Sequence, residues 1–181
     1  MGKKIVVITG SPRKKGNSFQ MTEAFIKRAE ELGHTVTRFD AAFHNLGGCH
    51  ACETCYSKGK PCTFDDDFNV IAPDILAADV VVFSTPVYWY SIPAQIKCVI
   101  DKMFYFVVGG KDIAGKSYAV ITCCEEDDKG VMDGVCTPLK RSADLIKWNL
   151  IGEVRVTGVM KVGDIDKTDG CKQAAALAEK I

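Results

Sequence analysis

The chain has 181 residues, of which 47% are hydrophobic and 25% are charged, as in a globular domain with a full core. Its 23 basic and 23 acidic residues cancel, which argues against function through bulk electrostatic attraction to nucleic acid or an anionic membrane. The longest apolar runs have strand length, far short of the roughly 20 residues of a membrane helix. We therefore expect a single soluble domain over residues 1–181, with no nucleic-acid or membrane partner.

Short β-branched runs alternate along the chain with longer stretches of helical period, a pattern typical of βαβ units and a parallel sheet. Strands are predicted over residues 4–9, 35–39, 79–84, 117–123 and 153–160. Helices are predicted over residues 18–32, from Pro93 to Val107, and over 132–148 and 168–181. The predicted fold class is α/β: a flavodoxin-like, doubly wound five-stranded parallel sheet of order 2-1-3-4-5 with helices on both faces.

Residues 40–68 follow neither period, and a stretch of this length inside a compact domain is usually functional or disordered. We interpret it as a cysteine-rich loop insertion, because it carries Cys49, Cys52, Cys55 and Cys62 in the spacing C-x2-C-x2-C-x6-C. The total of nine cysteines is odd, and no signal peptide is recognised, so we expect a cytoplasmic, reducing location. In that setting, such crowding favours metal binding or catalysis over disulfides.

The loop after the first strand, residues 10–18, reads G-S-P-R-K-K-G-N-S and leads onto a helix N-terminus. Free backbone N–H groups there attract a phosphate, to which Ser11 and Ser18 can donate and Arg13 can form two parallel bonds. Asn17 would brace the turn or donate as well. The spacing matches neither the triphosphate loop nor the dinucleotide fingerprint, so a monophosphate fits better. The plain alternative is that these residues only cap the helix.

The loop after the third strand, residues 84–93, reads S-T-P-V-Y-W-Y-S-I-P and presents three aromatic side chains. Aromatic faces can stack on a planar ring system, and backbone N–H groups of the loop can bond its polar edge. A subunit interface or plain core is the alternative explanation. Ligands bind such sheets at the carboxyl ends of strands one and three, so the two loops are expected to form one site.

Together, the S-P-R-x-x-G-N-S loop and the P-V-Y-W loop resemble the NAD(P)H-dependent FMN reductases and the related iron-sulfur flavoproteins, roughly over residues 3–125. The resemblance implies that the first loop holds the FMN phosphate through Ser11, Arg13, Asn17 and Ser18. It implies that the isoalloxazine ring lies against Pro86, Val87, Tyr88 and Trp89, with Thr122 and Cys123 in a third loop near the ring.

The third loop departs from the pattern of this family. Residues 123–128 read C-C-E-E-D-D, which is bulkier and more acidic than the small-residue turn usual at this position. Acidic side chains near the flavin would discourage a negatively charged partner, which bears on the access of a nicotinamide nucleotide.

The cysteine-rich loop also has a counterpart in this resemblance. Four soft thiolate ligands suit a [4Fe-4S] cluster or zinc. The spacing of Cys49, Cys52, Cys55 and Cys62 resembles that of the iron-sulfur flavoproteins, in which the cluster exchanges single electrons with FMN. Flavin reductases without a cluster can carry a similar loop, so a cluster, free thiols and structural zinc all stay open.

These features predict an FMN-dependent oxidoreductase, in which a donor such as NAD(P)H reduces the flavin and a small acceptor reoxidises it. No side chain is predicted to be catalytic, because the flavin carries the chemistry. The alternative is an iron-sulfur flavoprotein that carries electrons between protein partners such as ferredoxin, and a third reading is a thiol-based metal or redox sensor. The resemblance also implies a homodimer or homotetramer that helps to cover the flavin.

Overall fold

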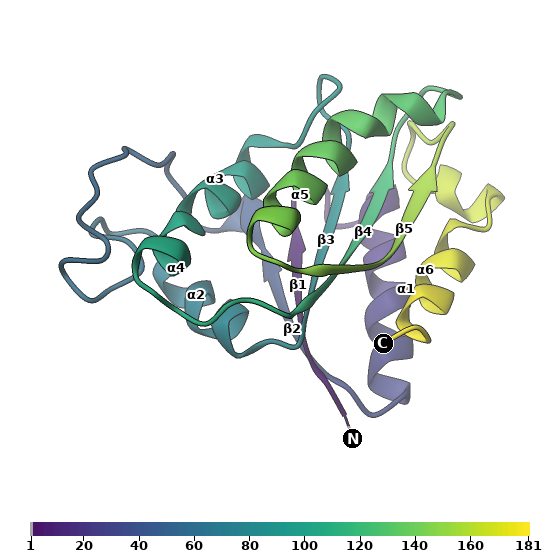
Figure 1. Ribbon diagram of the computed structural model, residues 1–181. Helices are drawn as coiled ribbons and strands as arrows, with labels where there is room; N and C mark the ends of the chain where they lie inside the picture. The colour runs from purple at the N-terminus through teal and green to yellow at the C-terminus, as the bar shows by residue number, and fades with distance from the viewer. Residues whose placement is uncertain (1) are drawn as a thin grey trace.

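The computed structural model describes residues 2–181, which contain a parallel five-stranded sheet of order β2-β1-β3-β4-β5 (Figure 1). The strands are β1 (Lys4–Thr9), β2 (Thr35–Asp40), β3 (Val80–Pro86), β4 (Ser117–Cys123) and β5 (Asn149–Val156). Each neighbouring pair in this order is parallel. The predicted flavodoxin-like strand order is therefore confirmed.

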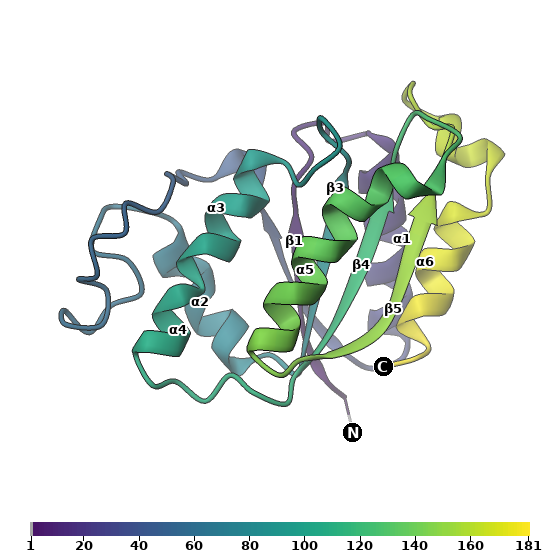
Figure 2. The same cartoon turned by 45° about the horizontal axis from the view of Figure 1, so that its top comes forward.

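Helices cover both faces of the sheet (Figures 1 and 2). One face carries α1 (Asn17–Glu31) and α6 (Gly170–Ala178), which pack against each other. The other face carries α2 (Phe68–Ala77), α3 (Ala94–Lys102), α4 (Phe104–Val108) and α5 (Asp133–Leu145). Three short 3-10 turns complete the described elements: η1 (Ala41–Phe43), η2 (Lys129–Met132) and η3 (Asp164–Lys167). No helix within residues 2–181 is long and apolar enough to cross a membrane.

The two faces have separate apolar cores because successive strand residues point to opposite sides of the sheet. In β1, Ile5 and Val7 belong to the core under α1 and α6, whereas Val6 and Ile8 belong to the core on the other face. All four side chains are buried, which explains why the strand is a continuous apolar run rather than an alternating one.

The predicted elements of the last third of the chain are displaced. The helix predicted over 132–148 ends at Leu145, and the strand predicted over 153–160 runs instead from Asn149 to Val156. The chain turns at Lys147, whose φ is 59°, and the Trp148 indole donates to the Ile113 carbonyl at 2.6 Å. The strand ends at Val156 because its ladder partner β4 ends at the paired residue. Residues 157–163 are thereby released as a loop.

Residues 44–67 contain neither helix nor strand, and this loop projects from the side of the molecule beside α2 and α3 (Figure 1). Its ends are fixed by an ion pair of 2.7 Å between Lys102 and Asp66, whose side chains are each 5% exposed. Lys102 also donates to the Gly47 carbonyl, and Asp66 accepts from the backbone N–H groups of Gly47 and Phe68. The loop is thus anchored at both ends, although it has no regular structure of its own.

Candidate functional site

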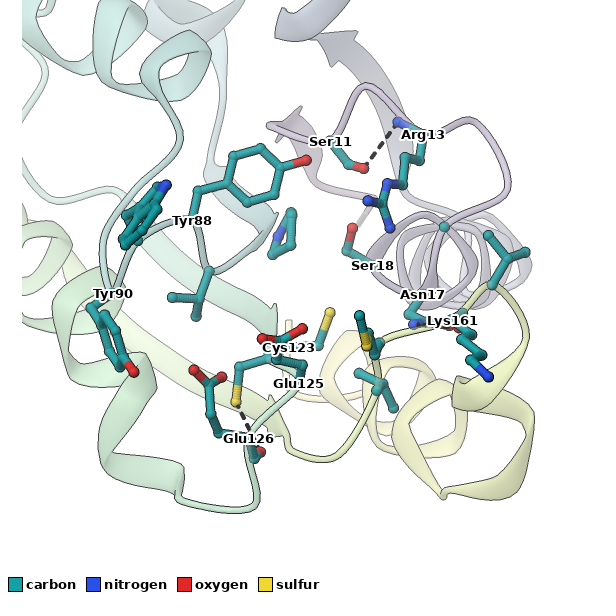
Figure 3. Close-up of a pocket in the computed structure, with 18 residues that line it drawn as sticks. Ser11, Arg13, Asn17, Ser18, Tyr88, Tyr90, Cys123, Glu125, Glu126 and Lys161 are labelled. Atoms are coloured by element: carbon teal, nitrogen blue, oxygen red, sulfur yellow. Dashed lines mark hydrogen bonds between the residues drawn. The ribbon is translucent and has the colours of Figure 1, made fainter.

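A cavity of about 820 Å³ lies at the carboxyl ends of four strands (Figure 3). Its walls come from four segments: residues 11–18 after β1, 86–90 after β3, 123–126 after β4 and 159–162 after β5. The volume is in the range of ordinary cofactor and substrate sites. The position agrees with the rule that open α/β sheets bind ligands where the strand order reverses.

The cavity brings together most of the cofactor-binding residues that the sequence predicts. Those that line it are Ser11, Arg13, Asn17, Ser18, Pro86, Val87, Tyr88, Trp89 and Cys123. Thr122 does not line it, because its side chain lies on the opposite side of β4 from that of Cys123 and is fully buried. The Thr122 hydroxyl has no hydrogen-bond partner within residues 2–181.

The N-terminus of α1 faces this cavity without a side-chain cap. Gly16 precedes the helix in an extended conformation, and the first turn contains no acidic residue. Ser11 accepts a bond of 3.1 Å from the Arg13 backbone N–H, which folds the loop back on itself. Uncapped N–H groups and the positive helix end, next to the hydroxyls of Ser11 and Ser18, suit a phosphate. The residues present therefore fit the phosphate group of FMN.

The Asn17 side chain is fixed by hydrogen bonds to a distant segment of the chain. Its side-chain amide donates to the Lys161 carbonyl at 3.0 Å and accepts from the Ile165 N–H at 3.2 Å. Both polar ends of this side chain are therefore engaged with a segment almost 150 residues further along the chain. In this structure Asn17 braces the cavity wall formed by the loop after β5.

The aromatic loop is a tight turn in an unusual backbone conformation. Tyr88 and Ser91 exchange two backbone hydrogen bonds of 3.0 Å, and the two residues between them, Trp89 and Tyr90, have φ values of 47° and 58°. Hairpin turns with two left-handed residues normally contain Asn and Gly. Bulky residues in this conformation cost on the order of 1–2 kcal/mol each, and such strain collects at functional sites. Trp89 is nevertheless 95% exposed.

Close packing behind this turn fixes its position. The Tyr90 carbonyl lies against Gly134 in α5, where an added Cβ would come within 1.6 Å of the oxygen. The Val87 N–H donates to the Cys123 carbonyl at 2.9 Å, which joins the turn to the end of β4. The backbone of the aromatic turn is therefore held in place by α5 and β4, which suits the binding of a planar ligand.

The third segment of the cavity wall, residues 123–126, carries two buried thiols, those of Cys123 and Cys124. Burial, reinforced by the neighbouring Cys124, raises the pKa of Cys123 to about 12, although the Ser18 backbone N–H opposes the rise. The pKa of Cys124 is also raised, by burial and then by the Glu126 carboxylate. Both side chains are therefore uncharged at neutral pH and add no negative charge to the cavity.

Part of the cavity was missed from the sequence. Tyr90, Cys124, Glu125 and Glu126 line it from loops that the sequence already places near the ligand, and the part that was missed is the segment 159–162, of which residues 159 and 160 were predicted to lie in a strand. A signal for the last segment exists, because Gly158 and Gly163 flank it and both have positive φ values, 71° and 90°. Paired glycines around an apolar run indicate a loop rather than a continuing strand.

The four predicted cluster ligands border a second, small cavity of about 40 Å³ against α3 and α4. Cys49 and Cys52 are exposed, Cys55 is half-buried and Cys62 is buried. Within residues 2–181, no three His, Cys, Asp or Glu side chains are close enough together to hold a metal ion. The thiols supply the right ligand chemistry for an iron-sulfur cluster, but their present arrangement does not fit one.

The Cys52 thiol has a lowered pKa. The Thr54 hydroxyl, 3.1 Å from its sulfur, stabilises the thiolate and lowers the pKa of Cys52. Ala51 and Glu53, on either side of it, have φ values of 49° and 55°. The backbone around Cys52 is therefore held in a left-handed conformation that non-glycine residues rarely adopt.

Comparison with known proteins agrees with this site. A family model described as NADPH-dependent FMN reductase matches residues 3–132. An iron-sulfur flavoprotein of Archaeoglobus fulgidus is 36% identical over 100 residues, which are 55% of this chain and 45% of that protein. One from Methanosarcina thermophila is 33% identical over 99 residues, 55% of this chain and 51% of that protein. The matches span about half the length of these relatives.

Solved structures show the same fold at low sequence identity. An azoreductase from Bacillus anthracis superposes with a TM-score of 0.76 over 100% of both chains at 20% identity. An NAD(P)H:quinone oxidoreductase from Methanothermobacter marburgensis gives 0.71 over 99% of this chain and 93% of that chain at 18% identity. The fold is flavodoxin-like, and the site lies where such proteins bind their ligands. This chain belongs to the NADPH-dependent FMN reductase family.

Proposed function

We propose that this chain is an FMN-dependent oxidoreductase that passes reducing equivalents from NAD(P)H through bound FMN to a small acceptor. The observation that carries the proposal is one cavity joining an uncapped helix N-terminus to a rigid aromatic turn. Both features lie inside the segment matched by the family model. When bound, FMN supplies the redox chemistry, and the protein supplies position and electrostatics.

At one end of the cavity, the chain binds an anion. Ser11 and Ser18 donate through their hydroxyls, and the α1 N-terminus supplies backbone N–H groups. Arg13, which has no ion-pair partner within residues 2–181, neutralises the phosphate. These groups orient the cofactor without taking part in its chemistry.

At the other end, Pro86, Val87, Tyr88 and Trp89 lie along the ring system. Their backbone is held by the bonds of Tyr88 to Ser91 and of Val87 to Cys123, so the ring meets a preformed surface. Thr122 is a residue of β4 with a fully buried side chain that does not line the cavity, so it packs within the sheet rather than touching the ligand. Cys123 contributes a neutral wall beside the phosphate end.

The test is an FMN titration of Arg13→Ala against the matched control Arg141→Ala, which removes an exposed arginine on α5. Loss of a charge-assisted bond to phosphate costs about 1.5–3 kcal/mol, so FMN affinity should fall by roughly tenfold or more. The control should bind like the wild type. An Arg13→Ala affinity within twofold of the wild type would remove Arg13 from the site.

The donor and acceptor are tested with the FMN-loaded protein under anaerobic conditions. NADH and NADPH are mixed in turn with the protein, and bleaching of the flavin absorbance is followed. Quinones and azo dyes are then offered as acceptors, because they are the substrate classes named in the structural neighbours. If neither nucleotide bleaches the flavin, the proposed donor is wrong.

A second candidate is an electron carrier in which Cys49, Cys52, Cys55 and Cys62 hold a [4Fe-4S] cluster and a protein such as ferredoxin is the partner. It is favoured by the name iron-sulfur flavoprotein among the relatives and by the shared small cavity of the four cysteines. Its formation requires the exposed part of the loop to close around the metal. Iron and acid-labile sulfide analysis of anaerobically purified protein decides it, with about four irons per chain expected for the cluster.

We also propose a cytoplasmic homodimer or homotetramer. All nine cysteines are free, which suits a reducing compartment. Trp89 and Tyr90 stand exposed at the cavity rim, where a second subunit would cover them. Light scattering of the FMN-loaded protein gives the oligomeric state, and Trp89→Ser should weaken the assembly if the rim is its interface.

A further inference from the structure

We propose that Glu125 and Glu126 select the electron acceptor by charge, favouring cationic and neutral acceptors and disfavouring anionic ones. The inference rests on the proposed function and concerns the same cavity. It assigns a role in specificity to the segment in which the sequence departs from the family pattern.

The cavity is electrically polarised. Figure 3 shows Ser11, Arg13 and Ser18 on one side and Glu125 and Glu126 on the opposite side. If the phosphate occupies the basic side, the acidic side borders the region in which the flavin meets its redox partners.

Glu125 and Glu126 have no internal partner within residues 2–181, unlike Asp128 and Asp133 nearby. Asp128 accepts a bond from the Gly130 N–H at 2.8 Å, and Asp133 pairs with Arg155 at 2.7 Å. Within residues 2–181, the carboxylates of Glu125 and Glu126 make neither a hydrogen bond nor an ion pair, although both line the cavity. Their negative charge is therefore not neutralised within residues 2–181 and can act on a ligand that enters the cavity.

The backbone holds this segment in place on both sides of Glu125. The Cys124 N–H donates to the Val156 carbonyl, and the Cys124 carbonyl accepts from the Val159 N–H, each at 3.0 Å. The Glu126 carbonyl accepts from the Gly158 N–H at 3.0 Å. The carboxylates are thus built into a wall fixed to β5 and its following loop, rather than carried by a free surface loop.

Fixed, unneutralised charges at the mouth of a cavity focus the electric field and alter the local concentration of charged substrates. Two carboxylates raise the encounter rate of a cation and lower that of an anion, and added salt weakens both effects, because charges further apart than the Debye length, about 10 Å at 0.1 M, are largely screened. A role in packing alone predicts no dependence on the sign of the acceptor charge.

The test uses chemically reduced, FMN-loaded protein mixed at low ionic strength with hexaammineruthenium(III), a trication, or ferricyanide, a trianion. Each fully reduced flavin, FMNH2, gives its two electrons to two molecules of the one-electron oxidant and releases two protons to solvent. In Glu125→Gln/Glu126→Gln, the rate constant should fall by about fivefold with the cation and rise by about fivefold with the anion.

The control Glu30→Gln/Asp74→Asn removes two exposed, unpaired carboxylates near the far ends of α1 and α2, and both of its rate constants should stay near wild type. A second readout is the reduction potential of bound FMN, which should become more positive in the glutamine variant but not in the control. In the wild type, but not in the glutamine variant, added salt should lower the rate constant with the cationic oxidant and raise it with the anionic one.

The outcomes separate the inference from the function on which it rests. Wild-type protein that binds no FMN, or whose reduced form neither oxidant reoxidises, overturns the proposed function and the inference with it. Normal reoxidation with the same response to both oxidants, and an unchanged potential in the glutamine variant, overturns the charge selection alone.

Discussion

The cavity at the strand ends and the cysteine-rich loop, residues 44–67, were both predicted from short sequence motifs. Their motif residues are positioned differently in the structure. The cavity residues follow directly from strands whose register is fixed by neighbouring ladders, so their side chains meet. The four cysteines stand in a long segment held mainly at its ends, and although all four border one small cavity, no three of them are close enough together to hold a metal ion within residues 2–181. A motif is positioned by the regular structure next to it, and spacing alone does not assemble a site.

The largest effect is expected where the cysteine-rich loop is anchored. Lys102→Met leaves the Asp66 carboxylate buried without its cation, so the free energy of unfolding should fall by about 3–5 kcal/mol in urea titrations. The control Lys97→Met breaks an exposed ion pair on the same helix and should cost less than about 1 kcal/mol. Equal losses in the two variants would mean that the buried pair does not anchor the loop.

The next largest effect is expected from replacing a glycine that packs behind the aromatic turn, and a glycine of the cysteine-rich loop serves as its control. Gly134→Ala drives a methyl group into the Tyr90 carbonyl, so the aromatic turn must shift, and FMN affinity should fall by about tenfold or more. Gly48→Ala, in the cysteine-rich loop, meets no atom within 4 Å and should leave both stability and FMN binding nearly unchanged. FMN titration and thermal unfolding measure both variants, and unaltered FMN binding in Gly134→Ala would contradict the rigid turn.

A smaller effect should follow from relieving the strain in the aromatic turn. Trp89→Gly accepts the left-handed conformation without penalty, so stability should rise by about 0.5–1 kcal/mol while FMN binds more weakly. Lys147→Gly is the matched control, because Lys147 has a φ of 59° away from the cavity. It should gain similar stability at unchanged FMN affinity. Loss of stability in Trp89→Gly would show that contacts of the indole outweigh the strain.

The smallest effect concerns thiol chemistry. Cys52 should react first with iodoacetamide as the pH rises, because its lowered pKa makes thiolate available at a lower pH, and Thr54→Val should slow it. Cys123 should stay unreactive until the pH approaches its pKa of about 12. Mass spectrometry of peptides after timed alkylation gives the order. Faster modification of Cys123 than of Cys52 would contradict both assignments.

The raised pKa of Cys123 also makes the stability of the fold depend on pH. The folded state holds the Cys123 proton more tightly than the unfolded chain does, so its contribution is complete below the ordinary thiol pKa. It is lost as the pH rises through the range up to about 12. Cys123→Ser should therefore flatten the decline of stability at alkaline pH.

The sequence placed the loop after β1 and the aromatic turn correctly at the cavity because each is a local signal. The apolar run of β1 ends at the glycine that opens residues 10–18, and the P-V-Y-W letters follow the apolar run of β3 directly. The wall at residues 159–162 was misplaced because Val154, Val156 and Val159 continue an apolar pattern past the end of the sheet. The strand ends at Val156 because the paired strand β4 ends opposite it, and the apolar pattern of the sequence does not show this.

By itself, then, the sequence determined the alternation of strands and helices and the two loops that follow the first and third strands. Each of these depends on periodicity and on residues adjacent in the chain. The tertiary structure decided that Asn17 braces the loop after β5, that Thr122 is turned away from the cavity and that Glu125 and Glu126 are left without partners. These are contacts between segments distant in sequence, and their geometry exists only once the sheet has brought them together.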